Sequence, residues 1–260
     1  MVNATISSQW TLTFEDDFDG PAGEAPCSSH WARDLGGWGF GNNELQCYTD
    51  GAANSFLDGH GCLVIEARNE AATDAKGNDR AYTSARLKTQ GIFSQTYGKF
   101  EARMKLPQGQ GIWPAFWLLG NAIDTTGWPE CGEIDIMESI GPHPKTLYGT
   151  LHGPGYCGGE NLQGSIHVEE PLSENFHVYG LEWEPGQLHW CFDGLCYRTI
   201  AEDESQGRGW PFDEPFFVVL NLAIGGYWPG PPDSTTTFPQ RLWVDYVRVW
   251  ARLAEPAPVN

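Results

Sequence analysis

Alternation of apolar and polar residues at every second position is the feature that most limits how this chain can fold. Gly98–Lys105 places Phe100, Ala102 and Met104 on one side of an extended segment and charged residues on the other. Similar patterns, separated by Gly, Pro, Asp and Asn, predict strands over 63–67, 176–183, 189–192 and 195–199. Two runs are apolar on both faces, as is typical of strands central to packed sheets: 216–224 and 242–250. Helical periodicity is nearly absent outside 201–207, so the pattern predicts an all-β sandwich.

Length and charge exclude several classes of protein. The 260 residues are undivided by any Pro/Ser-rich linker, so we predict a single domain over 1–260, with a core over about 12–250 and a C-terminal tail over 251–260. The net charge of −19 opposes binding to nucleic acid and to anionic membrane surfaces. No apolar run is long enough to span a bilayer. The first residues show no signal peptide.

One disulfide is predicted from hairpin geometry. Asp193-Gly194 is the two-residue signal of a type I′ turn, which makes Phe192 and Leu195 the closing pair. Cys191 and Cys196 then face each other at a non-hydrogen-bonded position, where Cα atoms lie about 4.5 Å apart. Such a bond indicates an oxidising compartment and hence secretion. The other five cysteines cannot be paired from the sequence, and because their number is odd at least one must be a free thiol. Their spacing does not match a zinc site.

Three carboxylates interrupt a strand pattern in Gly132–Ser139 (GEIDIMES). On a regular strand Glu133 and Asp135 share a face, but Glu138 lies five residues from Glu133 and would point to the opposite face. A β-bulge around Ile136–Met137 would bring all three to one face. Like charges so close raise one another's pKa. Three acids on one short strand therefore destabilise the fold unless that face is exposed to solvent. One interpretation is therefore an edge strand whose solvated acids prevent aggregation.

Tryptophans nearby favour a different interpretation. Trp113, Trp117 and Trp128 precede the acids within about twenty residues, and the chain holds 12 tryptophans in all. Pyranose rings stack on aromatic rings, so acids bordered by tryptophan are suited to glycoside hydrolysis. A retaining mechanism uses a nucleophile and an acid/base about 5–5.5 Å apart, with pKa values pushed apart.

Several motifs resemble glycoside hydrolase family 16, and the bacterial endo-β-1,3-glucanases (laminarinases) within it most of all. They are Trp113–Trp117 (WPAFW), Trp128–Glu138 (WPECGEIDIME), 150–153 (TLHG), 176–183 (FHVYGLEW), 221–226 (NLAIGG) and 244–249 (VDYVRV). The resemblance runs from about Leu12 to Trp250. It implies a β-jelly roll of two antiparallel sheets with a concave substrate cleft, with Glu133 as nucleophile, Glu138 as acid/base and Asp135 assisting. The Met-containing form of the motif is the bulged one.

The resemblance also implies residues around the catalytic group. Substrate contacts are implied for Asn42, Arg86, Trp113, Trp117, Trp128, His152 and Trp228, with His152 beside the acid/base. No catalytic cofactor is implied. A structural calcium ion is implied at the side chain of Asp245, with backbone oxygens near Glu15 and Gly59.

The sequence therefore predicts a secreted, monomeric endo-β-1,3-glucanase acting on a polysaccharide substrate. Two alternatives stay open. The same fold and mechanism would serve mixed-linkage β-1,3-1,4-glucan or agarose, because loops rather than catalytic residues set the subsites. A noncatalytic β-glucan-binding module is the alternative from another class, although binding alone does not require three acids in this arrangement.

Overall fold

Two antiparallel sheets make up most of the computed structural model, which describes residues 10–253. Within that range the larger sheet runs in the order β17 (Leu195–Ala201), β16 (Gln187–Phe192), β15 (His177–Glu184), β10 (Gly98–Lys105), β19 (Gln240–Arg252), β5 (Leu63–Ala67) and β4 (Ser55–Leu57), and β1 (Trp10–Asp16) also pairs with β19. The second sheet runs in the order β14 (Leu162–His167), β13 (Thr146–His152), β12 (Glu133–Glu138), β11 (Ile112–Gly120), β18 (Phe216–Ile224), β9 (Arg86–Lys88) and β2 (Ala32–Asp34).

Minor elements connect these sheets. Two short strand pairs are β3 (Gln46–Tyr48) with β8 (Tyr82–Ser84), which is parallel, and β6 (Ala72–Thr73) with β7 (Asp79–Arg80). The helices are α1 (Ile123–Thr126) and the 3₁₀ turns η1 (Gly158–Glu160) and η2 (Glu202–Ser205). No helix within residues 10–253 is long and apolar enough to cross a membrane.

The predicted strands are confirmed, and η2 lies inside the predicted helical stretch. β18 is buried along its whole length, as its apolar sequence predicts for a central strand. β19 differs, because only one face of it is buried and Trp243 and Trp250 lie half-exposed on the other. It also continues to Arg252, so the predicted tail begins later than residue 251, and residues 254–260 lie outside the described range.

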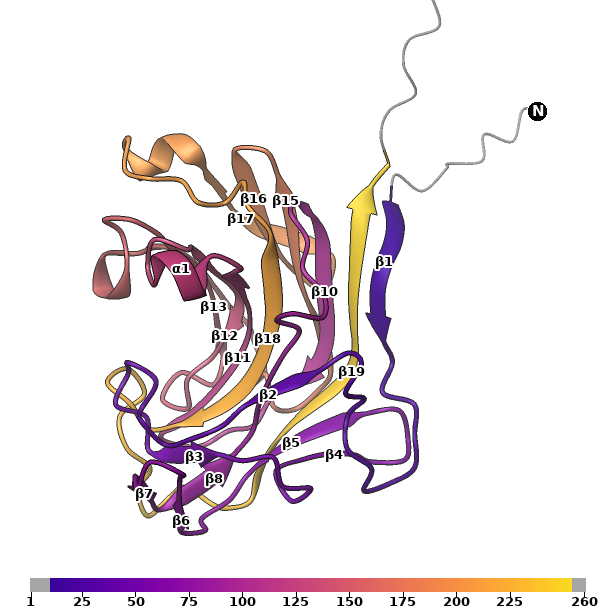
Figure 1. The fold of residues 1–260 in the computed structure, drawn as a ribbon, viewed down its shortest axis with the longest axis vertical. Coiled ribbons are helices and arrows are strands. Elements are labelled where there is room, and N and C mark those ends of the chain that lie inside the picture. Colours follow the sequence, from indigo (N-terminus) through magenta and orange to yellow (C-terminus); the bar gives the residue numbers. More distant parts are fainter. Residues whose placement is uncertain (1–9, 254–260) are drawn as a thin grey trace, which may run out of the picture.

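The core lies between the two sheets, and the seven-stranded sheet curves away from it. Apolar side chains of alternating positions on both sheets form one cluster, for example Phe100 and Met104 of β10 against Phe116 and Leu118 of β11. Figure 1 shows β11, β12, β13 and β18 bending so that their hollow side faces away from β10, β15 and β19. The predicted β-jelly-roll class is confirmed, and the concave face belongs to the sheet that carries the three acids.

The predicted hairpin disulfide is present between β16 and β17. Cys191 and Cys196 are bonded, with Cα atoms 3.8 Å apart, and they face each other in the strand register. Asp193 and Gly194 both have positive φ, as a type I′ turn requires. All five remaining cysteines are free thiols, so no second pair forms among them. Burial raises the pKa of Cys62 and Cys131 to about 11, which makes these two thiols unreactive at neutral pH.

Removing this disulfide is expected to lower stability moderately. The bond closes a loop of only a few residues, so its loss should cost about 2 kcal/mol of unfolding free energy. For a chain of this size that corresponds to a fall of about 4–8 °C in Tm. The double variant Cys191→Ser/Cys196→Ser can be compared with Cys27→Ser, an exposed free thiol, by calorimetry. Equal Tm values for all three proteins would contradict a stabilising role for the bond.

Candidate active site

β12 contains the β-bulge that the spacing of its acids requires. Against β11, Phe116 faces Met137 but the next residue, Trp117, faces Asp135, so Ile136 has no partner of its own. The register with β13 shifts over the same residues. The bulge predicted at this position is therefore confirmed.

The bulge returns Glu138 to the face that carries Glu133 and Asp135. Their partners on β11 are two residues apart and share that face: Ala115, Trp117 and Leu119. The apolar residues of β12 are buried in the core between the sheets: Ile134, Ile136 and Met137. One short strand thus supplies three acids to the concave face and three apolar side chains to the core.

Trp190 of β16 supports this bulge from the opposite sheet. Its indole Nε1 donates a hydrogen bond of 2.8 Å to the backbone oxygen of Asp135, and its side chain is fully buried. Buried carbonyl groups are costly when unpaired, and a bulge disrupts the strand ladder that would otherwise pair them. Gly149 of β13 leaves room for the indole, since a Cβ there would lie 2.2 Å from Cδ1 of Trp190.

The concave face around the acids is largely buried rather than wet. Asp135 is 4% exposed and Glu138 is 8% exposed. Burial is the main cause that raises the pKa of Glu133, Asp135 and Glu138, each to about 8, and the charge of Asp135 adds to the rise for both glutamates. Neighbouring carboxylates oppose one another's ionisation, so at least one of the three is protonated near neutral pH.

Glu138 lies in an aromatic corner. Trp113 Nε1 donates to Glu138 Oε1 at 3.0 Å. The ring of Trp228 lies 5.5 Å from that of Trp113 and 5.0 Å from that of Tyr148, both edge-on. Tyr148 faces Glu138 across the β12–β13 pair and was not predicted from the sequence. It could have been found from its spacing to His152, because residues four apart lie on the same face of a strand such as β13.

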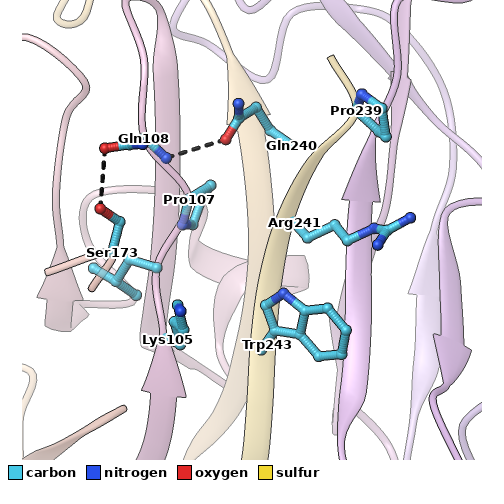
Figure 2. Close-up of a pocket in the computed structure, with 9 residues that line it drawn as sticks. Lys105, Pro107, Gln108, Ser173, Pro239, Gln240, Arg241 and Trp243 are labelled. Atoms are coloured by element: carbon cyan, nitrogen blue, oxygen red, sulfur yellow. Dashed lines mark hydrogen bonds between the residues drawn. The ribbon is translucent and has the colours of Figure 1, made fainter. Parts of the chain in front are cut away.

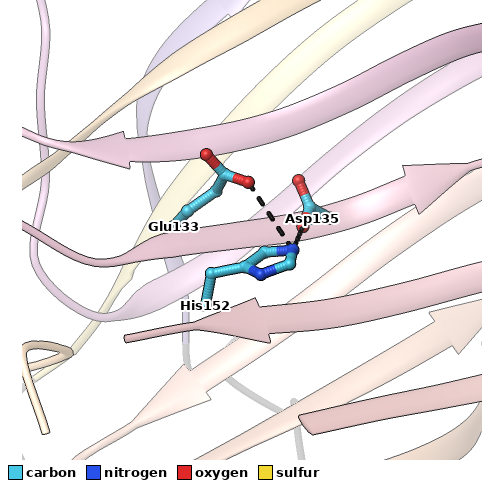
Figure 3. Close-up of side chains that lie close together, drawn as sticks. All are labelled: Glu133, Asp135 and His152. Carbon is cyan, nitrogen blue, oxygen red and sulfur yellow. Dashed lines mark ion pairs between the residues drawn. The ribbon is translucent and has the colours of Figure 1, made fainter. Parts of the chain in front are cut away.

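His152 contacts two of the acids. Its Nε2 lies 3.3 Å from Asp135 Oδ2 and 3.7 Å from Glu133 Oε1, and Figure 3 shows the imidazole directed at both. The resemblance implied a place beside Glu138, but the closest ion pairs are with the other two acids. The reason is register, because His152 directly faces Glu133. Trp128, 45% exposed, lies next to the imidazole with 5.8 Å between ring centroids.

Glu133, Asp135 and His152 could hold a metal ion by distance alone, since one donor atom of each lies within 4.8 Å of the others. The hydrogen bonding of the imidazole opposes this. The backbone N–H of Gly158 donates to His152 Nδ1 at 3.2 Å, which leaves the proton of the neutral ring on Nε2. A metal-binding histidine instead donates from its second nitrogen. The Nε2 proton of the neutral ring is therefore on the side of the two carboxylates, although Asp135 Oδ2 accepts no hydrogen bond.

A row of side chains leads from the acids across the concave face. Glu138 faces Ala115 on β11, Ala115 faces Asn221 on β18, and Asn221 faces Arg86 on β9. Residues that face each other across antiparallel strands share one side of the sheet. Adjacent strands are about 4.8 Å apart, so this row spans roughly 14 Å. It is long enough for an extended ligand to cross several strands.

The remaining predicted contacts are Arg86, which ends this row, together with Trp117 and Asn42. The Arg86 guanidinium lies 4.7 Å from the ring of Trp117 and 5.1 Å from the ring of Phe40. Asn42 lies in the loop before β3, and its carbonyl accepts a 2.9 Å bond from the N–H of Tyr227, which is 80% exposed. The structure thus brings Trp113, Trp128, His152 and Trp228 to the acids. Of the other three, Trp117 directly faces Asp135, Arg86 stacks on Trp117, and the Asn42 carbonyl lies beside Gly226, next to Trp113.

The residues implied for calcium are Asp245 and Glu15 on strands of the other sheet and Gly59 in the loop between β4 and β5. Asp245 of β19 forms a 2.6 Å ion pair through Oδ2 with Arg103 Nη1. Its charge also helps to raise the pKa of the Cys62 thiol, which follows Gly59 by three residues. Glu15 lies on β1, which pairs with β19. Carboxylate and carbonyl oxygens suit calcium, but the guanidinium already offsets the charge of Asp245. The residues fit the ion only in part, and calcium stays a prediction.

A surface hollow of about 310 Å³ lies beside the ends of β10 and β19, away from the acids (Figure 2). Its polar groups bond to one another. The backbone N–H of Gln108 donates to Gln240 Oε1, and Ser173 Oγ donates to Gln108 Oε1, each at 3.1 Å. It contains none of the three carboxylates of β12, so we assign it no part in the chemistry.

Comparisons with known proteins agree with this geometry. A beta-glucanase of Rhodothermus marinus is 42% identical over 251 residues, which is 93% of this chain and 85% of that protein. A glucan endo-1,3-beta-glucosidase of Cryptopygus antarcticus is 37% identical over 93% of this chain and 92% of that protein. The laminarinase catalytic domain of Thermotoga maritima superposes with a TM-score of 0.89 at 46% identity, covering 94% of this chain and 99% of that one.

The family description that matches the sequence is glycosyl hydrolases family 16, over residues 42–248. That range contains β12 and every other strand of the seven-stranded sheet except β2. Because the match covers most of the chain and the relatives are similar over nearly their whole length, the chain belongs to glycosyl hydrolases family 16.

Proposed function

We propose that the protein is an endo-acting, retaining glycoside hydrolase that cleaves β-1,3-glucan by double displacement. The observation that carries the proposal is the bulged strand β12, which gathers Glu133, Asp135 and Glu138 on one largely buried face. Glu138 protonates the glycosidic oxygen while Glu133 attacks the anomeric carbon, and the leaving sugar departs. Water that has given its proton to Glu138 then hydrolyses the glycosyl-enzyme.

Asp135 and His152 assist by setting the charge of the nucleophile. His152 Nε2 lies on the side of Asp135 and Glu133, where it favours the ionised form of Glu133. Trp113 donates to Glu138 Oε1 and holds that carboxyl beside the bond to be cleaved. The retaining mechanism requires an ionised Glu133 and a protonated Glu138, and we assign this division of charge to Asp135 and His152.

The proposed substrate contacts supply stacking and polar surfaces. Trp113, Trp117, Trp128 and Trp228 lie around the acids, and Arg86 and Asn42 extend the surface. Flat aromatic faces suit pyranose rings. A net charge of −19 suits a neutral polysaccharide, because it repels polyanions. The relatives named for 1,3-β-glucan linkages support this substrate over other neutral glycans.

The decisive experiment is product analysis on laminarin, lichenan, agarose and xyloglucan. We expect internal cleavage of laminarin, with the first-formed anomer in the β configuration by NMR. Strong cleavage of agarose without cleavage of laminarin would overturn the substrate. Preference for lichenan would favour the mixed-linkage alternative. An inverted first product would remove the nucleophile role of Glu133.

Trp190→Phe is expected to impair catalysis through the bulge. The change keeps an aromatic ring but leaves the backbone oxygen of Asp135 unpaired, which costs about 1–3 kcal/mol of unfolding free energy. A shift of the acids should lower kcat about tenfold to 100-fold. Trp183→Phe is the matched control, because the buried Trp183 Nε1 donates to the backbone oxygen of Phe212 at 3.0 Å and not to a residue of β12. Equal kcat losses in the two variants would contradict this role.

For the implied calcium ion we propose a site formed by Asp245 with backbone oxygens near Glu15 and Gly59. Calcium at about 100 times its Kd should add about 2.7 kcal/mol of stability. The expected rise in Tm over an EDTA-treated sample is about 5–10 °C. Asp245→Asn should abolish the rise. Identical Tm values in calcium and EDTA would exclude the site.

We also propose that the protein acts outside the cell as a monomer. The disulfide between Cys191 and Cys196 supports an oxidising compartment. Thiol titration of denatured protein purified from the culture medium, with and without reductant, tests the oxidising compartment, and gel filtration of the native protein tests the monomer. The expected result is five free thiols before reduction and seven after it.

A further inference from the structure

Glu44 is a buried carboxylate that the proposed reaction does not use. It lies two residues after Asn42 and is only 5% exposed. Its Oε2 accepts hydrogen bonds from Gln46 Nε2 at 2.5 Å and from the Tyr48 hydroxyl at 3.2 Å, and its Oε1 accepts from Asn42 Nδ2 at 3.4 Å. A buried charge is retained only where such partners compensate for lost hydration. The partners of Glu44 therefore indicate what it holds in place.

Two further hydrogen bonds connect Glu44 to the concave face. The Tyr48 hydroxyl oxygen accepts from Asn221 Nδ2 at 3.1 Å, and Asn221 Oδ1 accepts from Trp117 Nε1 at 2.7 Å. All of these side chains are buried, with Tyr48 at 1%, Asn221 at 6% and Trp117 at 8% exposed. A continuous relay thus runs from the indole of a proposed sugar contact to the carboxylate.

The direction of every bond in this relay is fixed by chemistry. An indole N–H can only donate, so the Asn221 amide must present its oxygen to Trp117 and its nitrogen to Tyr48. Tyr48 then has one proton to donate, and an ionised Glu44 can only accept it. Hydrogen bonds aligned in this way strengthen one another inside a protein. Glu44 is the terminal acceptor on which the orientation depends.

The other side of Trp117 is held by a positive charge. The Arg86 guanidinium stacks on its ring, and the same charge favours the ionised form of Glu44 against the effect of burial. Asn221 also stands in the row between Ala115 and Arg86. Trp117 is therefore fixed at its nitrogen through the relay and at its face by Arg86.

We propose that Glu44 is a positioning residue that, through Tyr48 and Asn221, sets the plane of Trp117 and directly holds the amide of Asn42. The proposal rests on the proposed function, in which Trp117 and Asn42 contact the glycan. A side chain already held in its binding orientation loses less entropy when ligand binds. None of the hydrogen bonds of the relay reaches Glu133 or Glu138, so its loss should weaken glycan binding and leave the chemical step largely intact.

Tyr48→Phe tests this with the smallest change, because it deletes only the hydroxyl that joins Glu44 to Asn221. We expect KM for laminarin oligosaccharides to rise about three- to tenfold, as for the loss of one or two neutral hydrogen bonds, with kcat within about twofold of wild type. Tyr97→Phe is the matched control. It removes a 2.9 Å bond from a tyrosine hydroxyl to Asp213 Oδ1, away from the concave face, and should leave KM unchanged.

Substitutions of Glu44 separate its charge from its shape. Glu44→Gln keeps one acceptor for Tyr48 and should raise KM less than Glu44→Ala, which keeps none. An unchanged KM in Tyr48→Phe, or a fall in kcat at unchanged KM, would overturn the inference while the wild-type enzyme still cleaves glucan. Failure of the wild-type protein to cleave any glycan of the panel would contradict the proposed function instead. Calorimetric titration of the oligosaccharides against wild type and Tyr48→Phe would then decide the inference, and equal affinities would reject it.

Discussion

Glu133→Gln is expected to lower kcat on laminarin by about 10⁴- to 10⁶-fold, the range seen when a catalytic nucleophile is removed. The amide has the size of the carboxylate but cannot form the glycosyl ester. Its neighbours on the concave face remain, so affinity for laminarin oligosaccharides should stay close to wild type. Reducing-end release measures the first quantity, and titration calorimetry measures the second.

Glu130→Gln is the matched control for this experiment, because Glu130 is an exposed glutamate three residues before β12. It should retain wild-type activity. Cleavage of laminarin by Glu133→Gln at the wild-type rate would show that the nucleophile is a different residue. Binding without cleavage by the wild-type protein would establish the noncatalytic β-glucan-binding module instead.

Glu138→Ala is expected to lower kcat on laminarin by about 10²- to 10⁴-fold, because protonation of the leaving oxygen is lost. An aryl glucoside with a good leaving group needs no such proton, so the first step should survive and the glycosyl-enzyme should accumulate. Azide needs no general base, and added azide should restore turnover. Its attack on the face opposite Glu133 should give a β-glycosyl azide.

The same reagent distinguishes the two glutamates. In Glu133→Ala, azide takes the place of the missing carboxylate and attacks the substrate directly, so the product should be an α-glycosyl azide. The configuration of each azide can be read by NMR. The opposite assignment of configurations would mean that the roles of Glu133 and Glu138 are exchanged.

Local patterns were sufficient for most of the fold. β10 and β18 have the predicted bounds because period-two alternation and continuous apolarity report directly on burial. The hairpin disulfide followed from one Asp-Gly turn. β19 was misread as buried on both faces, because tryptophan and tyrosine cover a sheet's outer side as readily as they fill a core.

The candidate site was predictable along one strand and less so between strands. Glu133 and Glu138 are an odd number of residues apart, so a bulge was required to place them on one face, and the bulge is present. Tyr148, Asn221 and Glu44 were missed. Asn221 had a signal, since it is the one polar residue in the apolar run of β18, but its partner Trp117 is 104 residues away. No local pattern specifies such a pair.

The sequence by itself determined the alternation of its strands, the face shared by Glu133 and Asp135, and the need for a bulge before Glu138. These properties follow from covalent geometry and the two-residue repeat of an extended chain. Tertiary structure alone decided which acids His152 contacts, that Trp190 supports the bulge from the opposite sheet, and that Glu44 is joined to Trp117. These depend on strand order and register, which are set by how the whole core packs.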